Sequence, residues 1–63
     1  MQMKQRYRHY SMRVRRDIAI ELLKLENAEI NKENISNIQR QEKVSNRLFG
    51  YDVDTGSVTV CEN

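Results

Sequence analysis

The chain has 63 residues, of which 38% are hydrophobic and 32% charged, and its net charge is +2. A chain of this length forms one small domain that buries only about 60% of its unfolded surface, so it usually needs a further source of stability. A single cysteine excludes an intrachain disulfide, and one histidine with one cysteine argues against a structural zinc site. We therefore expect one domain over residues 1–63, stabilised by self-association.

The apolar segments are short. No stretch approaches the ~20 apolar residues that cross a bilayer, and the N-terminus has no apolar core typical of a signal peptide. The sequence therefore predicts a soluble, cytoplasmic protein with no membrane partner.

Basic residues are concentrated at the start of the chain. Residues 1–16 hold six basic residues and no acidic one, whereas residues 17–63 hold five basic residues and all nine acidic ones. Arginine binds phosphates through a planar fork and stacks on aromatic rings, so a basic run with interleaved tyrosines is typical of nucleic-acid binding. We expect residues 1–16 to be a basic arm that contacts DNA or RNA through Lys4, Arg6, Tyr7, Arg8, Arg13, Arg15 and Arg16.

The same charge pattern permits other interpretations. The arm could bind an acidic protein surface, it could be a solvated tail kept for solubility, or it could pair with the acidic second part of the chain. Its conformation is also open, because either Ser11 or Asp17 could cap the helix that follows. If Asp17 is the cap, Tyr10, Met12 and Val14 alternate with polar residues as they would in a strand.

A helical core is expected over residues 17–49, since the chain has no proline and its first glycine is Gly50. The first helix is expected to cover at least residues 17–28. Apolar residues at steps of three and four form one stripe, namely Met3, Tyr7, Tyr10, Val14, Ile18, Leu22 and Leu25. Met12, Ala19 and Leu23 form a second stripe. Two stripes predict two neighbours, the next helix and a second copy, and hence a homodimer.

The second helix is expected to begin at the N-cap Asn31 and to end before Gly50. Ile35 and Ile38 share one face, whereas Val44 and Leu48 share a face rotated by roughly 130° on an ideal helix. Either the helix breaks between these pairs, or the second pair points to a partner or to solvent.

Residues 50–63 are expected to form a tail or a small hairpin. Val53 and the pair Val58 and Val60 flank a turn that ends in Gly56. The fold class predicted is therefore mainly α: two principal helices arranged as a helical hairpin or a helix-turn-helix-like unit, dimeric, with a short C-terminal β-hairpin.

Enzymatic chemistry and cofactors are not expected. His9 and Cys61 lie at opposite ends of the chain, and there is no glycine-rich phosphate loop. Asp52 and Asp54 resemble a fragment of a calcium loop without its later ligands, so no metal site is expected.

The segment from Ile20 to Ile35 resembles the opening of a winged helix-turn-helix domain, with an amphipathic helix, an Asn-containing link and a capped second helix. Residues 43–48 are similar to the start of its recognition helix, and the hairpin from Val53 to Val60 would be its wing. This resemblance implies that DNA is contacted by Gln41, Lys43, Ser45, Asn46 and Arg47.

The chain also resembles ribbon-helix-helix repressors of phage and plasmid type, in which a short strand is followed by two helices and two chains intertwine. That resemblance implies a strand from Tyr10 to Arg15 that pairs across a dimer, with Arg13 and Arg15 entering the major groove. Asp17 and Asn31 would then cap the two helices.

The function predicted is that of a small nucleic-acid-binding regulator, homodimeric, which acts by occupying its site. The alternative is a small helical protein–protein interaction module, an accessory protein of phage or plasmid type that modulates a host protein.

Overall fold

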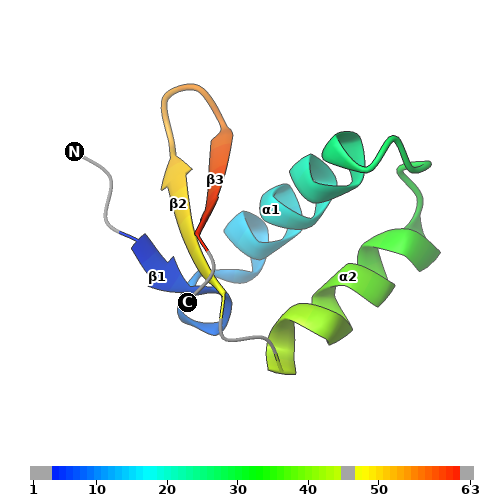
Figure 1. The fold of residues 1–63 in the computed structure, drawn as a ribbon, viewed down its shortest axis with the longest axis horizontal. Helices are drawn as coiled ribbons and strands as arrows, with labels where there is room; N and C mark the ends of the chain where they lie inside the picture. Colours follow the sequence, from blue (N-terminus) through cyan, green and yellow to red (C-terminus); the bar gives the residue numbers. More distant parts are fainter. Residues whose placement is uncertain (1–3, 45–46, 62–63) are drawn as a thin grey trace.

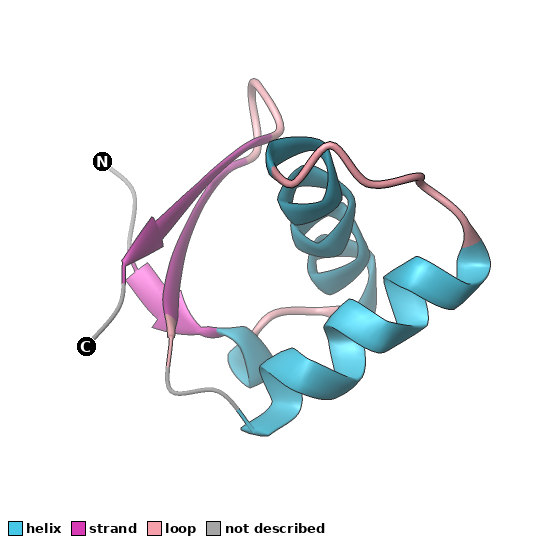
Figure 2. Cartoon of the chain, turned by 45° about the vertical axis from the view of Figure 1, so that its right-hand side comes forward, coloured by secondary structure: helices cyan, strands magenta, loops and turns pink. Residues whose placement is uncertain are grey.

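The fold combines two helices with a three-stranded antiparallel sheet (Figure 1). The computed structural model describes residues 4–44 and 47–61. The elements in chain order are β1 (Lys4–Arg6), the 3-10 turn η1 (Tyr7–His9), α1 (Met12–Leu25), α2 (Lys32–Val44), β2 (Leu48–Asp52) and β3 (Ser57–Cys61). Both helices lie on one side of the sheet (Figure 2). The prediction of a mainly α fold is therefore wrong, and the chain is an α+β protein.

The sheet is built around β2, which pairs with β1 on one side and β3 on the other. Lys4 lies opposite Gly50, and Arg6 lies opposite Leu48, so the first strand is joined to a segment more than forty residues later in the chain. Three residues are too few to show strand periodicity in a sequence. This long-range pairing is the reason that the sequence left the conformation of residues 1–16 open.

Helix α1 begins earlier than residue 17. The Ser11 side chain accepts a hydrogen bond of 3.3 Å from the backbone N–H of Val14, so Ser11 and not Asp17 is the N-cap. Residues 12–15 are therefore helical, and the ribbon strand from Tyr10 to Arg15 is wrong.

Helix α1 ends in a Schellman motif. Asn27 adopts a left-handed conformation with φ of 56°, and its N–H donates to the Lys24 carbonyl at 3.1 Å. The N–H of Ala28 reaches back to the Leu23 carbonyl at 2.9 Å. These two bonds satisfy carbonyls that a helix end leaves unpaired, and asparagine tolerates this conformation better than most residues.

Helix α2 is capped as predicted. Asn31 Oδ1 accepts a hydrogen bond of 2.7 Å from the backbone N–H of Asn34. The helix ends at Val44, so the predicted continuation to Phe49 is wrong. Leu48 and Phe49 belong instead to β2, where their backbone pairs with β1 and β3. These partners are remote in the chain, so the local sequence pattern does not indicate them.

The β2–β3 hairpin also differs from the expected one. Its five cross-strand pairs run from Leu48 opposite Cys61 to Asp52 opposite Ser57. Val53, expected in a strand, lies in the turn and is 72% exposed. Gly56 has a φ of 70°, and its N–H closes the turn by donating to the Asp52 carbonyl at 2.7 Å.

The buried core is built from η1, α1, α2 and β2. Its buried members are Tyr7, Val14, Ile18, Ala19, Leu22, Leu23, Ile38 and Phe49. Ala19 and Leu23 come from the second apolar stripe, and they are covered within the same chain. Met12, the third member of that stripe, is 78% exposed, so the stripe is covered only in part and the homodimer stays a prediction.

Alternation along the strands gives the sheet two different faces. Phe49 and its neighbour Val60, with Tyr51 and its neighbour Val58, pack toward the helices. The residues between them face away from the helices, on the side that neither helix covers (Figure 2).

Candidate nucleic-acid interface

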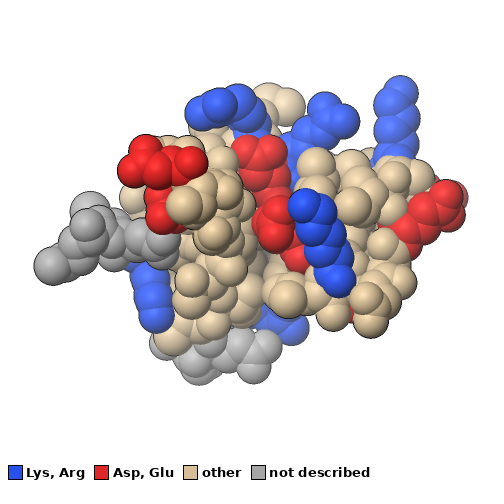
Figure 3. Space-filling view, turned by 90° about the horizontal axis from the view of Figure 1, so that it is seen from above, with Lys and Arg blue, Asp and Glu red and all other residues tan. Residues whose placement is uncertain are grey.

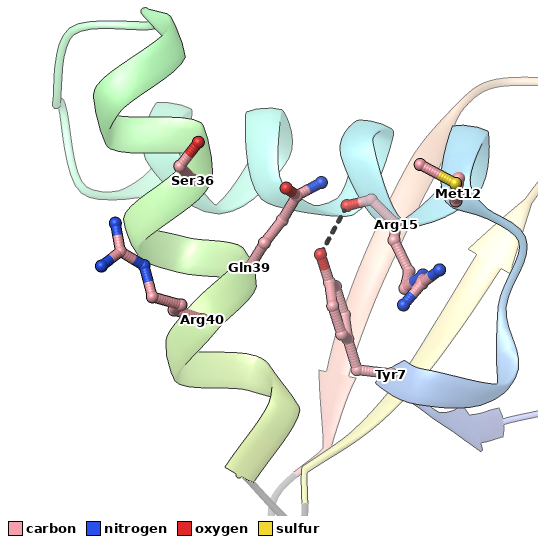
Figure 4. A pocket seen from close by; sticks show the side chains of 6 residues that line it. All are labelled: Tyr7, Met12, Arg15, Ser36, Gln39 and Arg40. Carbon is pink, nitrogen blue, oxygen red and sulfur yellow. Dashed lines mark hydrogen bonds between the residues drawn. The ribbon is translucent and has the colours of Figure 1, made fainter.

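A groove of about 400 Å³ lies where η1, the first turns of α1 and the middle of α2 meet (Figure 4). Its volume is within the range of ligand sites in proteins. The residues that line it are Tyr7, Met12, Arg15, Ser36, Gln39 and Arg40. None of the six is acidic, and two carry guanidinium groups, so the groove favours an anion.

Tyr7 fixes the geometry of the groove. Its hydroxyl donates a hydrogen bond of 3.0 Å to the backbone carbonyl of Arg15, which ties η1 to α1 (Figure 4). Its ring packs edge-to-face on Phe49, with ring centres 5.5 Å apart. Tyr7 is only 1% exposed, so its ring is not available to stack on a base, and its predicted role in binding is corrected to a structural one.

Tyr10 adds a second tie between the start of α1 and the sheet. Its hydroxyl donates a hydrogen bond to the backbone carbonyl of Phe49. Burial raises the pKa of Tyr10, while a hydrogen bond from the backbone of Gln5 acts in the opposite direction. The segment that leads into α1 is therefore tied to the central strand.

Arg15 supplies an unpaired donor. Its Nε atom is buried and has no hydrogen-bond partner in the part of the chain that the structure describes. A buried donor without a partner costs free energy, because it has lost its bond to water and gained no other acceptor. Among the residues predicted to contact nucleic acid, Arg15 is the one that the structure places in the groove together with Tyr7.

The other wall is one face of α2. Ser36, Gln39 and Arg40 are spaced so that they share that face. Figure 4 shows the Gln39 amide pointing toward α1, whereas the Arg40 guanidinium lies on the side of α2 away from Tyr7. Arg40 Nη2 donates to Asn37 Oδ1 at 3.3 Å. The groove therefore combines the Arg15 guanidinium with a hydroxyl and an amide, and the Arg40 guanidinium lies at its outer side; all of these groups contact phosphates.

Four more of the predicted basic residues are exposed around this region of the chain. Arg13 and Arg16 lie on the solvent side of α1, Lys4 in β1 and Arg8 in η1. None of the four forms a salt bridge with any residue in the ranges 4–44 and 47–61. Pairing with the acidic second part of the chain therefore does not account for these four residues. Arg6 is partly buried in β1.

The helix-turn-helix resemblance implies a recognition helix after α2. The described residues contain no such helix. Lys43 lies in the last turn of α2, and Arg47 lies just before β2, while Ser45 and Asn46 are outside the described residues. The expected recognition helix over residues 43–48 is wrong, because Leu48 already belongs to the sheet. Gln41 is exposed on α2.

Three groove residues were not predicted from the sequence, namely Ser36, Gln39 and Arg40. Their spacing in the sequence does indicate that the three residues share one face of a helix. Nothing in the sequence indicated that this face lies opposite Arg15, since that depends on how α1 packs on α2.

Charge alone does not define a binding surface. The face of the molecule in Figure 3 has Lys and Arg side chains interspersed with Asp and Glu. At the far end of α1, Lys24 Nζ pairs with Glu21 Oε1 at 3.2 Å. The groove differs from this mixed surface because its lining has no acidic member.

Metal-ligand clusters and membrane-spanning helices are not found among the described residues. The described residues contain no group of three or more histidine, cysteine or acidic side chains that could hold a metal. Neither α1 nor α2 has the length and apolar character needed to cross a bilayer, and no other helix of the described ranges does. Comparison with protein family models, with curated proteins and with solved structures found no match to this chain.

Proposed function

We propose that this protein binds nucleic acid, with the sugar–phosphate backbone held in the groove between α1 and α2, and that it regulates by occupying its site. The observation that carries the proposal is the lining of the groove. Arg15 and Arg40 contribute positive charge, Ser36 and Gln39 contribute neutral donors, and no acidic residue opposes them. A backbone phosphate satisfies this set of donors.

Arg15 is the central residue of the proposal. Its buried Nε lacks a protein partner, and the Tyr7 hydroxyl holds the adjacent backbone in place. If the Arg15 side chain reorients on binding, a phosphate oxygen would satisfy this donor and remove a cost that the free protein carries. Arg13 and Arg16 on the exposed side of α1 would add attraction to neighbouring phosphates, with binding driven by counterion release.

Base contacts would come from α2. Asn37 and Gln41 are exposed on this helix, and their amides can form paired hydrogen bonds with adenine edges. An α-helix fits the major groove of B-form DNA. Regulation by occupying a site then requires no catalysed reaction. We also propose that the protein acts in the cytosol.

Fluorescence anisotropy with a short duplex of random sequence tests the proposal. The wild type is compared with Arg15→Gln/Arg40→Gln, and the matched control is Lys24→Gln/Lys32→Gln, which removes the same charge from exposed lysines outside the groove. We expect the groove variant to bind at least about tenfold more weakly than the control, since each lost phosphate contact weakens binding on all sequences.

Two results contradict the proposal in different ways. Equal affinity of the groove variant and its control would remove the groove from the interface. No binding of wild type to duplex DNA, single-stranded DNA or RNA at low salt would end the nucleic-acid proposal altogether and favour a protein partner.

A further inference from the structure

The two edges of the sheet are protected to different degrees. The β1 edge is three residues long and carries Lys4 and Arg6. Short edge strands and charged side chains are the usual devices that prevent pairing with another chain. The β3 edge has five residues, Ser57–Cys61, with no charge, proline or glycine.

The outer edge of β3 is also regular and unpaired. Its five residues form an unbroken register with β2, so no bulge bends the strand away. None of its backbone groups bonds to anything beyond β2 within the described residues. Val58 and Val60 lie on the helix side and remain only partly buried. The edge thus offers both backbone bonds and apolar surface.

We propose that β3 pairs antiparallel with β3 of a second copy, which joins the two sheets into one of six strands. A second copy is the occupant because a strand edge without charge does not repel its own copy, and twofold antiparallel pairing uses the same edge on both sides. A domain of 63 residues also gains stability that its own core supplies poorly.

The register follows from the side-chain pattern. A twofold axis perpendicular to the sheet keeps both helical layers on one side and sets residues of the same face opposite each other. Centring the axis on Thr59 uses all five residues of β3, with Ser57 opposite Cys61 of the second copy. In this register Val58 of each copy lies opposite Val60 of the other. The partly buried valines of the two copies therefore form one apolar cluster across the interface. Centring on Val58 or Val60 uses fewer pairs from the strand.

This proposal stands on the sheet and is independent of nucleic-acid binding. The groove lies between η1, α1 and α2, and β3 contributes none of its lining. Either proposal can therefore fail while the other holds.

The first test is Thr59→Glu against Thr55→Glu. Both threonines are exposed, but Thr59 is on the proposed axis and Thr55 is in the turn. Two glutamates would face each other in the Thr59→Glu dimer, whereas the monomer keeps its fold because the new carboxylate shares a face and a row with Lys4. We expect the dimer dissociation constant, measured by sedimentation equilibrium, to rise about tenfold or more in Thr59→Glu and to stay near wild type in Thr55→Glu.

The second test reads the register directly. In a Cys61→Ser background, Thr59→Cys sets two thiols opposite each other at the axis, within disulfide reach. Ser57→Cys in the same background sets its two thiols about 13 Å apart along the strands. We expect rapid oxidative cross-linking of the first variant and little of the second.

Three outcomes overturn the proposal. They are a wild type that stays monomeric at all concentrations, equal weakening of the dimer by Thr59→Glu and Thr55→Glu, and equal cross-linking of the two cysteine variants. Monomeric wild type with intact nucleic-acid binding would leave the proposed function in place.

Discussion

The Tyr51 hydroxyl donates a hydrogen bond of 2.8 Å to Asp17 Oδ2, and this bond ties the central strand β2 to helix α1. Asp17 was considered as an N-cap in the sequence, but it lies in the second turn of the helix. Its carboxylate instead accepts a bond from a residue 34 positions later. The contact joins the sheet to the helix that carries the arginines.

This contact makes the fold sensitive to high pH. The hydrogen bond to Asp17 raises the pKa of Tyr51, because the phenol donates only while it is protonated. The stabilisation is therefore fully present below the pKa of an unfolded tyrosine, about 10, and is lost as the pH rises through the higher folded value. Tyr51→Phe should lower the melting temperature near neutral pH, and the difference from wild type should shrink in alkaline solution. A constant difference across this range would contradict the assignment.

The aromatic pair at the centre of the core should dominate stability. Phe49 is fully buried and packs edge-to-face on Tyr7. Phe49→Ala should cost about 3–5 kcal/mol, which is enough to unfold a domain of this size. Phe49→Leu should cost less, and Val53→Ala, at a residue that is 72% exposed, should be near neutral. Urea denaturation followed by circular dichroism measures all three, and a folded Phe49→Ala variant of wild-type stability would contradict the core as described.

The two helix caps should each contribute measurably. Ser11→Ala removes the acceptor for the Val14 N–H, and Asn31→Ala removes the acceptor for the Asn34 N–H. Each should lower the free energy of unfolding by about 1 kcal/mol. Gln41→Ala, at an exposed position of α2, is the control and should change little. If Asp17 capped α1 instead, Ser11→Ala would have no effect.

The salt dependence of the binding affinity should report how many phosphates the arginines contact. For duplex DNA, the slope of log affinity against log salt concentration falls by about 0.9 for each phosphate neutralised. Arg16→Ala should reduce the magnitude of this slope by about one such contact. Lys24→Ala should leave it unchanged, because Lys24 pairs with Glu21 at the other end of α1. Identical slopes for the two variants would place Arg16 outside the interface.

Local signals in the sequence were read correctly where the structure depends on near neighbours. The amphipathic character of α1, the cap at Asn31 and the turn residue Gly56 all act over a few positions. Periodicity and capping are properties of single turns, so they are visible in a single sequence.

Residue-level predictions of the site were weaker for the same reason. Arg15 was identified from the charge pattern, but Ser36, Gln39 and Arg40 were not, because they join it only through helix packing. Tyr7 was predicted to be accessible, and the structure places it in the core. A basic run does not reveal which of its members the fold will bury.

The amino-acid sequence by itself determined the two helices, the N-terminal concentration of positive charge and the apolar residues available for a core. Only the tertiary structure decided that Lys4–Arg6 and Leu48–Asp52 are adjacent strands, and that Arg15 and Arg40 line one groove. The physical reason is distance along the chain. A helix is stabilised by bonds between residues four apart, whereas a sheet and a groove form only when the whole core brings remote segments together.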